Sequence, residues 1–179
     1  RERAIPVVRR SSGGLAIVTG PGCLMYAVVL SYARQPILRS LDAAHRHVLG
    51  TLADALGPLV PGVVRCGTSD LAWRDRKFSG NSARCKQTHL LYHGTLLYDF
   101  RLELIGQCLA PPWRAPDYRR GRAHLEFVTN LPLPRDTLRE AVLSAWRPTG
   151  QMPLPKQQLA ALLSARYERP QWHTHGATR

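Results

Sequence analysis

The chain has 179 residues, of which 44% are hydrophobic, and a formal net charge of +13 at pH 7. This length and composition provide a core for one domain with a short appendage and exclude disorder throughout the chain. The longest apolar run, residues 23–30, is too short to span a bilayer, so no transmembrane segment is predicted. A surface with this charge attracts nucleic acid, anionic membranes or acidic proteins.

The first third of the chain predicts strands followed by a helix. Residues 5–10 and 15–19 have the apolar, β-branched composition of short strands, and the serines and glycines of residues 11–14 predict a turn between them. Residues 23–32 are apolar, which fits a buried strand or a short helix, and their β-branched and aromatic side chains favour a third strand. Residues 38–56 carry apolar side chains every three or four positions, which predicts an amphipathic helix.

The rest of the chain changes from strands to helices. A strand is predicted from residue 63, followed by a hairpin whose arms are residues 70–73 and 76–79, and a strand-rich stretch spans residues 88–100. Further expected elements are helices at 102–109, 136–146 and 156–167, a basic loop at 111–122, and a frayed tail from residue 169. Strands that precede helices in this way indicate an α+β fold, which we expect to be a mixed, largely antiparallel sheet flanked by helices.

Three short blocks carry residue types suited to binding an anion. The first places Arg10 before Ser12, Gly13 and Gly14, where a guanidinium and open backbone amides can hold a phosphate. The second is Lys77-Phe78-Ser79-Gly80, notable because only three of the 25 cationic side chains are lysines. The third places His93 and Gly94 in an apolar strand. A hairpin with surface arginines, a solvated lysine and a core histidine explain the same three patterns.

Taken together and in order, these blocks resemble the lipoate–protein ligase family of the biotin/lipoate ligase superfamily. The matching stretches read RRSSGG, DRKFSGNS and YHGTLL. Residues 68–71, Thr-Ser-Asp-Leu, are similar to the family's Asn-Asp-Leu/Ile segment, and residues 128–131 read Val-Thr-Asn-Leu as in the family. The resemblance covers residues 5–147. We expect residues 1–147 to form the catalytic domain, followed by a Pro-rich linker, helix and tail over residues 148–179.

The resemblance implies a fold related to biotin ligases and to the catalytic domain of class II aminoacyl-tRNA synthetases. It implies that lipoate or octanoate reacts with Mg²⁺·ATP to give acyl-AMP, and that a carrier lysine then displaces AMP. The implied partners are acidic lipoyl carrier domains of 2-oxoacid dehydrogenase complexes or the glycine-cleavage carrier protein, in the cytoplasm. Family members carry a strand and a helix before the Arg-Arg motif, so we expect this chain to lack them.

The resemblance also implies roles for particular residues. Lys77 matches the motif lysine, which stabilises charge between the α-phosphate and the acyl carbonyl. The nucleotide-binding positions are Arg10, Ser12, Gly13, Gly14, Leu15, Ala16, Ile17 and Val18, and the substrate-binding positions are Asp70, Ser79, Gly80, His93 and Gly94. Two departures stand out. Leu15 replaces a third glycine, and residues 19–23, Thr-Gly-Pro-Gly-Cys, replace the family's His-Asp-x-Gly-Asn.

Two alternatives stay open. Related octanoyl and lipoyl transferases take the acyl group from a thioester and use a cysteine, for which Cys66 is the candidate. Its basic neighbours Arg65, Arg74 and Lys77 are expected to lower the pKa of its thiol. A basic nucleic-acid-binding module is the other alternative, suggested by aromatic residues among arginines at 113–122, although a solvated loop is the interpretation we favour. The four cysteines include no CxxC pair, and no metal site is predicted.

Overall fold

The computed structural model describes residues 5–174 and divides into two compact units. The larger unit is residues 12–148, and the smaller unit joins residues 5–11 to residues 149–174. The start of the chain therefore groups with its end. The predicted division at residue 147 into a catalytic domain and an appendage stays a prediction.

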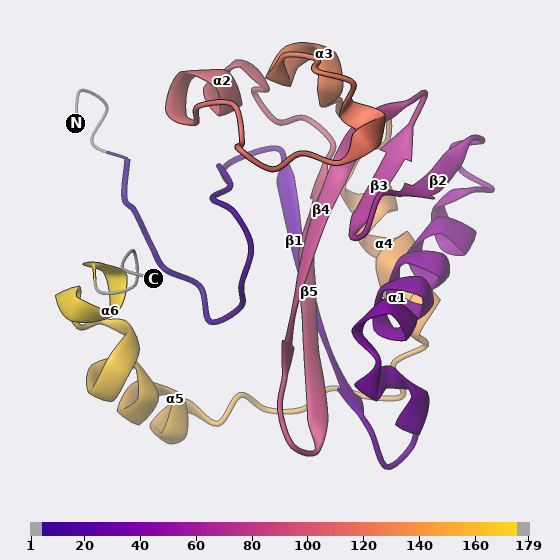
Figure 1. The fold of residues 1–179 in the computed structure, drawn as a ribbon. Helices are drawn as coiled ribbons and strands as arrows, with labels where there is room; N and C mark the ends of the chain where they lie inside the picture. The colour runs from indigo at the N-terminus through magenta and orange to yellow at the C-terminus, as the bar shows by residue number, and fades with distance from the viewer. Residues whose placement is uncertain (1–4, 175–179) are drawn as a thin grey trace. The chain divides into compact units, whose positions relative to one another are not determined.

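The larger unit is built on one antiparallel sheet of five strands (Figure 1). The strand order across the sheet is β1-β5-β4-β3-β2, so β2 to β5 form a meander and β1 lies beside its last strand. The strands are β1 (Cys23–Ser31), β2 (Val63–Cys66), β3 (Asp70–Trp73), β4 (Arg76–Cys85) and β5 (His89–Leu97). One parallel bridge, between Lys77 and Val128, adds a second direction at the edge of β4. The α+β fold class and the antiparallel character of the sheet are confirmed.

Two helices cover one face of this sheet, α1 (Leu41–Leu56) and α4 (Arg135–Trp146) (Figure 1). Their apolar stripes include Val48, Leu52 and Leu138, which are fully buried in the same core cluster as Phe78 and Leu96 of the strands. Because α1 and α4 occupy a single face, the opposite face of the sheet presents a different set of side chains. We call these the core face and the open face.

Most predicted elements of the larger unit are present, with shifted ends. The predicted helix over 38–56 begins at Leu41, because the Ser40 side chain accepts a hydrogen bond from the Ala43 amide and caps the helix there. Residues 36–39 form a separate 3₁₀ turn, η1 (Pro36–Arg39). The hairpin tip is at Arg74 and Asp75 as predicted, and both have positive φ, 51° and 58°, the geometry of a tight two-residue hairpin loop.

The two strands predicted before residue 20 are wrong. Residues 5–10 and 15–19 have no regular secondary structure, although their side chains have strand-like composition. A strand requires a neighbouring strand to pair with its amides and carbonyls, and no described strand forms such a ladder with these segments. Val7 and Val8 are accordingly exposed.

Short helical elements connect β5 to α4. They are α2 (Glu103–Cys108), the 3₁₀ turn η2 (Asp117–Arg119) and α3 (His124–Phe127). The helix predicted at 102–109 is confirmed in α2, whereas the single turns η2 and α3 are too short to give a periodic sequence signal. They lie at the end of the sheet where β3 and β4 meet, as Figure 1 shows.

The smaller unit contains three consecutive helical segments. They are α5 (Lys156–Leu162), a π-helical stretch η3 (Leu163–Tyr167) and α6 (Pro170–Thr174). The predicted helix over 156–167 is thus present, but its last five residues are π-helical. The tail expected to fray from residue 169 is helical in α6, and residues 175–179 lie outside the described part. Within residues 5–174, no helix combines the length and the apolar character needed to cross a bilayer.

Candidate functional site

A β-bulge places Lys77 on the open face of the sheet. In the β3–β4 register Leu71 pairs with Ser79 and Ala72 pairs with Lys77, so Phe78 has no partner. Without that extra residue, Lys77 and Gly80 would point to opposite faces, because side chains alternate along a strand. The bulge restores the match, so that Lys77 and Gly80 share the open face while Phe78 is fully buried in the core.

Asp70 fixes the position of the lysine ammonium group. Lys77 Nζ lies 2.8 Å from Asp70 Oδ1, and the side chain of Asp70 is only 8% exposed against 30% for Lys77. The other carboxylate oxygen accepts a hydrogen bond of 2.9 Å from the Tyr118 hydroxyl. Burial and the Asp70 charge raise the pKa of Tyr118, which keeps its hydroxyl protonated as a donor. The carboxylate is thus held from two sides, and the ammonium group has a defined position at the surface.

Gly80 provides the space that this lysine occupies. A Cβ at Gly80 would come within 3.0 Å of both Cε and Nζ of Lys77. The end of the lysine side chain therefore lies over Gly80, next to Asp70, which pairs with Gly80 across β3–β4. Lys77, Asp70 and Gly80 thus lie close together, while the roles predicted for them from the sequence stay predictions.

His93 joins the open face one strand further on. It pairs with Ser82 across β4–β5 and with Ala27 across β1–β5, so all three share a face. The Ser12 hydroxyl lies 2.6 Å from His93 Nε2, and the Ser82 hydroxyl donates a hydrogen bond of 2.9 Å to the Gly13 carbonyl. The Ser12–Gly13 turn is thereby bound to the same face as Lys77.

Not every predicted site residue points to that face. Ser79 and Gly94 lie on the core face, where Ser79 is almost fully buried and a Cβ on Gly94 would collide with the Asn81 side chain. Only the backbone of these two residues can therefore contribute to the open face. Leu15, Ala16 and Ile17 are exposed, while Gly14 is exposed and Val18 half-buried. Arg10 belongs to the smaller unit.

Cys66 is a direct neighbour of the Lys77–Asp70 pair. It pairs with Asp70 in the β2–β3 register, so the two side chains share the open face. Burial, together with the carboxylates of Asp75 and Asp70, raises the pKa of its thiol. The expected lowering by nearby cations is therefore wrong, since the carboxylates and the burial outweigh them. A thiol with a raised pKa is mostly protonated at neutral pH and is a poor nucleophile.

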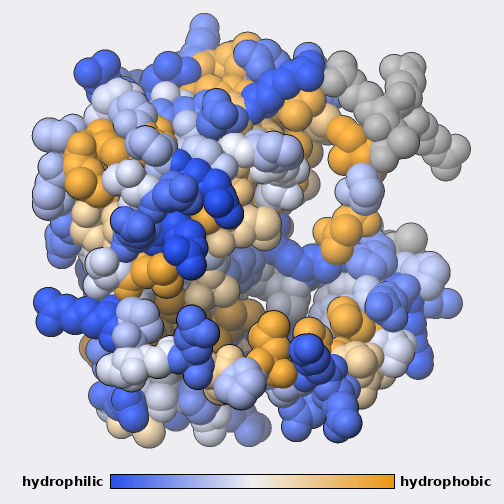
Figure 2. Space-filling view, turned by 180° about the vertical axis from the view of Figure 1, so that it is seen from behind, coloured by the Kyte–Doolittle hydropathy of each residue, from blue (hydrophilic) through white to orange (hydrophobic). Residues whose placement is uncertain are grey.

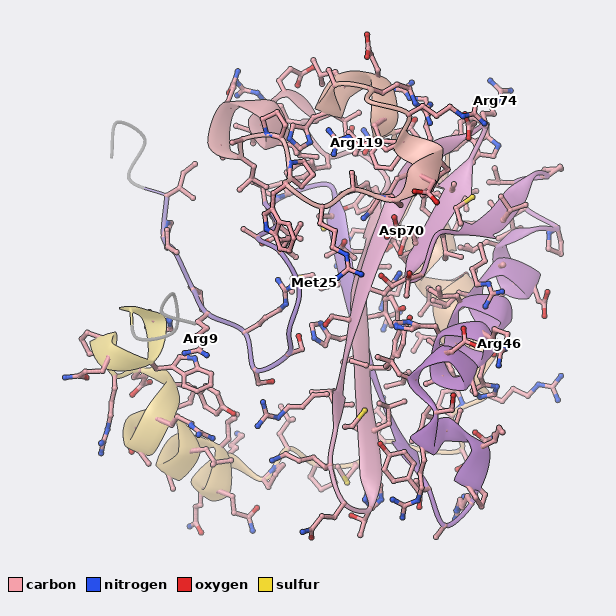
Figure 3. The ribbon with its side chains drawn as sticks, in the orientation of Figure 1. Arg9, Met25, Arg46, Asp70, Arg74 and Arg119 are labelled. Carbon is pink, nitrogen blue, oxygen red and sulfur yellow. The ribbon has the colours of Figure 1, made fainter. Side chains whose placement is uncertain are left out.

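Sequence reasoning missed the part played by the basic loop, residues 111–122. This loop forms an open pocket of about 530 Å³ whose lining includes Pro116, Arg119 and Arg120. It packs against the β2–β3 turn, since a Cβ at Gly67 would lie 3.3 Å from Pro116 and Tyr118. In Figure 3 the labelled Arg119 lies beside the end of the sheet that carries Asp70. A single tyrosine in an Arg-rich loop gives no sequence signal that it binds a carboxylate.

The described chain offers no ready-made metal cage. Across residues 5–174, no group of three or more His, Cys, Asp or Glu side chains is placed to hold a metal ion. The face shown in Figure 2 has hydrophilic residues interspersed with apolar patches. The chemistry that the open face offers is therefore a positioned ammonium group, a carboxylate and an imidazole on a partly apolar surface.

Comparison with known families identifies the family to which this chain belongs. The family model for the lipoyl protein ligase A/B catalytic domain matches residues 1–144. The chain belongs to this family. The resemblance read from the three sequence blocks is thereby confirmed.

Individual relatives agree with that assignment. A probable lipoate-protein ligase A of Mycoplasma pneumoniae is 30% identical over 95 residues, which are 53% of this chain and 27% of that protein. The chain thus matches about a quarter of this curated relative.

Solved structures share the fold. A lipoate-protein ligase A bound with ATP has a TM-score of 0.76 at 19% identity, over 96% of this chain and 73% of that one. A bipartite lipoate protein ligase from Thermoplasma acidophilum, described with its E2 lipoyl domain, has the same score and identity over 96% and 71%. A T. acidophilum protein with bound lipoic acid has a TM-score of 0.75 at 17% identity, over 96% and 73%.

Proposed function

We propose that the chain is the catalytic part of an ATP-dependent lipoate or octanoate protein ligase. The observation that carries this proposal is the Lys77 ammonium group, which Asp70 holds 2.8 Å away on the open face above Gly80. A cation fixed in this way needs no reorganisation to stabilise negative charge that develops during a reaction. The structures solved with ATP and with lipoic acid support the choice of ligands.

In the first step the acid's carboxylate oxygen attacks the α-phosphorus of ATP. The new oxygen–phosphorus bond forms as the bond to the β-phosphate bridge breaks, and pyrophosphate leaves. Lys77 stabilises the charge that builds on the α-phosphate and the acyl carbonyl. Arg10 is proposed to bind the nucleotide phosphates, as the resemblance implies, together with the Ser12–Gly14 turn.

In the second step the amine of a carrier lysine attacks the acyl carbonyl. AMP leaves with the electron pair of the broken carbon–oxygen bond, and the amine loses a proton. The nucleophile belongs to the partner, so Lys77 acts as a charge stabiliser throughout. Asp70 serves as the positioning residue that keeps the ammonium group over Gly80.

The apolar part of the open face suits the hydrocarbon chain of the acid. Met25 and Ala27 of β1 lie on this face next to Thr95 and His93 of β5, and Met25 is 64% exposed. An alkyl chain placed along these residues would bury apolar surface while its carboxyl group reaches the polar end of the face. His93 would line this pocket near the carbonyl.

Mg²⁺ is proposed to accompany ATP. The side chains of residues 5–174 form no cluster able to cage a metal, and Mg²⁺ is often held by substrate phosphates, waters and one or two carboxylates. Its chemistry would be to offset phosphate charge.

A thioester-dependent transferase is the second candidate, because Cys66 pairs with Asp70 beside Lys77. The raised pKa of its thiol argues against it as the acyl acceptor. Both candidates share a lipoyl carrier domain as partner, for which the exposed Arg114 and Arg120 of the basic loop offer a cationic docking surface.

One assay separates the two candidates. The protein and a lipoyl domain are incubated either with octanoate and ATP or with an octanoyl thioester, and the intact mass of the lipoyl domain is measured. A mass gain that requires ATP and persists in Cys66→Ala supports the ligase. A gain only from the thioester that is lost in Cys66→Ala establishes the transferase, and no gain from either donor contradicts both.

A further inference from the structure

Within the smaller unit, side chains of α6 bind one residue of the N-terminal segment, Arg9. The Arg9 amide donates a hydrogen bond of 3.1 Å to His173 Nδ1, and the Arg9 carbonyl accepts one of 2.9 Å from the indole nitrogen of Trp172. Both backbone groups of one residue are thus bound by two adjacent side chains of α6. Figure 3 shows Arg9 alongside this helix.

The side chain of Arg9 is held as well. Its guanidinium lies 4.9 Å from the centre of the Trp172 ring, and the guanidinium of Arg166 lies at the same distance. The ring of Tyr167 meets Trp172 edge-on, with 5.1 Å between centroids. Two cations and an edge-on ring around one indole fix its orientation, and with it the direction of the indole N–H.

The hydrogen bonds also fix the state of His173. Its Nδ1 accepts the proton of the Arg9 amide, and its Nε2 lies 2.8 Å from the Tyr167 carbonyl, which can only accept. In this arrangement Nδ1 is the acceptor and Nε2 is the donor. His173 acts as a link between η3 and the backbone of Arg9.

From this geometry we infer that Trp172 and His173 are positioning residues for Arg10. Residues 5–10 have no strand partner among the described residues, so the hydrogen bonds that a sheet would supply to Arg9 come from α6 instead. These contacts hold the amide, carbonyl and guanidinium of Arg9. They therefore fix the peptide group between Arg9 and Arg10, and with it the direction in which the Arg10 side chain leaves the backbone. The inference rests on the proposed role of Arg10 in binding ATP. It gives the C-terminal helices a task in nucleotide affinity, although they contain no residue proposed to touch substrate.

The test compares the KM for ATP with kcat in a set of variants, with Arg10→Ala as the reference. Trp172→Ala removes the hydrogen bond to the Arg9 carbonyl and the ring on which the Arg9 and Arg166 guanidinium groups lie. We expect the KM for ATP to rise about tenfold or more, while kcat at saturating ATP changes little. Trp172→Phe keeps an aromatic ring but loses the indole donor, and the expected rise is about threefold. Gln171→Ala, an exposed neighbour on α6, is the control and should leave both constants unchanged.

His173 offers a conservative rescue that a merely structural role would not show. His173→Asn retains an oxygen near the position of Nδ1 to accept the Arg9 amide and should keep the KM for ATP near that of the wild type. His173→Leu has no acceptor and should raise it. Hydrogen exchange of the Arg9 amide gives a readout independent of activity, with protection expected in the wild type and in His173→Asn but lost in His173→Leu.

The outcomes separate this inference from the proposed function. If Arg10→Ala raises the KM for ATP and Trp172→Ala does not, the positioning role is overturned and the proposed function stands. If the two variants share a raised KM and the Arg9 amide loses protection in Trp172→Ala, the positioning role is supported. If Arg10→Ala leaves the KM unchanged, the nucleotide role of Arg10 falls and the positioning role falls with it.

Discussion

The two faces of the sheet use the same five strands for opposite purposes. On the core face Phe78, Leu90, Tyr92 and Leu96 are fully buried beneath α1 and α4. On the open face β3, β4 and β5 present Asp70, Lys77 and His93, and the neighbouring strand β1 presents exposed apolar side chains. Strand alternation therefore accounts for which side chains lie on the open face, with one exception.

The exception is the β-bulge at Phe78. Strict alternation would place Lys77 on the same face as Ser79, which is almost fully buried on the core face. The unpaired Phe78 shifts the lysine to the open face and inserts a buried aromatic side chain into the core. The bulge in β4 thus places Lys77 on the open face and Phe78 in the core. Because the two faces hold different side chains, we expect open-face variants to change activity and core-face variants to change stability.

The largest expected effect is on the open face. Replacing Lys77 with Ala removes the positioned cation, so acyl transfer should fall by about a hundredfold or more. The rate of carrier acylation at saturating substrates measures this. Lys86→Ala is the matched control, because Lys86 is exposed in the β4–β5 turn and should leave the rate unchanged. Equal losses in the two variants would contradict a specific role for Lys77.

The core face is broken most directly at Gly94. A side chain there collides with Asn81, which accepts a hydrogen bond from the Tyr26 hydroxyl and donates one to the Ser69 carbonyl. Gly94→Ala should therefore lower the free energy of unfolding by about 2–3 kcal/mol. Urea denaturation is the measurement.

Gly50→Ala is the control for that variant. Gly50 lies within α1 with open space around its missing Cβ, so this change should stabilise the protein by up to about 1 kcal/mol. If both glycine variants change stability equally, the packing described for Gly94 is not what makes that position a glycine.

The basic loop gives a smaller, kinetic contrast. Arg114→Glu reverses an exposed charge in the loop beside the open face and should raise the KM for an acidic lipoyl domain several-fold. The effect should shrink as salt is added. Arg139→Glu makes the same change at an exposed position of α4, the helix that covers the core face. It should leave that KM unaltered. Equal effects of both variants would indicate attraction by net charge alone, without a docking surface.

The smallest effect concerns His45, buried on the core face. Its ring nitrogen lies 2.8 Å from the Tyr92 hydroxyl, and burial lowers its pKa from the ordinary value of 6.5. The unfolded chain therefore takes up a proton at a higher pH than the folded one, so stability falls as the pH drops below about 6.5.

His45→Asn tests this directly, since its amide oxygen can accept the Tyr92 hydroxyl without titrating. Urea midpoints between pH 7.5 and 5.5 should decline less for the variant than for the wild type. Identical pH profiles would show that His45 does not contribute to the pH dependence.

Much of the core face could be predicted from sequence because it depends on local periodicity. The apolar spacing of α1 and the strand-rich composition of residues 88–100 indicated the right elements. The strands expected at 5–10 and 15–19 did not form because strand composition does not provide a neighbouring strand, and no described strand forms a ladder with them. The start of α1 moved because Ser40 caps it, which helical periodicity alone does not reveal.

Less of the candidate site could be predicted from the sequence, and the roles of its residues stay predictions. Lys77, Asp70, Gly80 and His93 were identified through family resemblance, and the structure places the first three in contact range. The bulge at Phe78, the Tyr118 hydrogen bond to Asp70 and the grip of α6 on Arg9 depend on residues distant in sequence. No local pattern encodes such pairings, so sequence could name the lysine but not the groups that position it.

The most direct test of the proposed ligase is lipoate-dependent exchange of labelled pyrophosphate into ATP, without any carrier protein. This exchange reports formation of acyl-AMP alone. The account predicts exchange that requires lipoate or octanoate, is lost in Lys77→Ala and is retained in Lys86→Ala and Cys66→Ala. No exchange in a folded wild-type protein, together with carrier acylation from an octanoyl thioester, would contradict it.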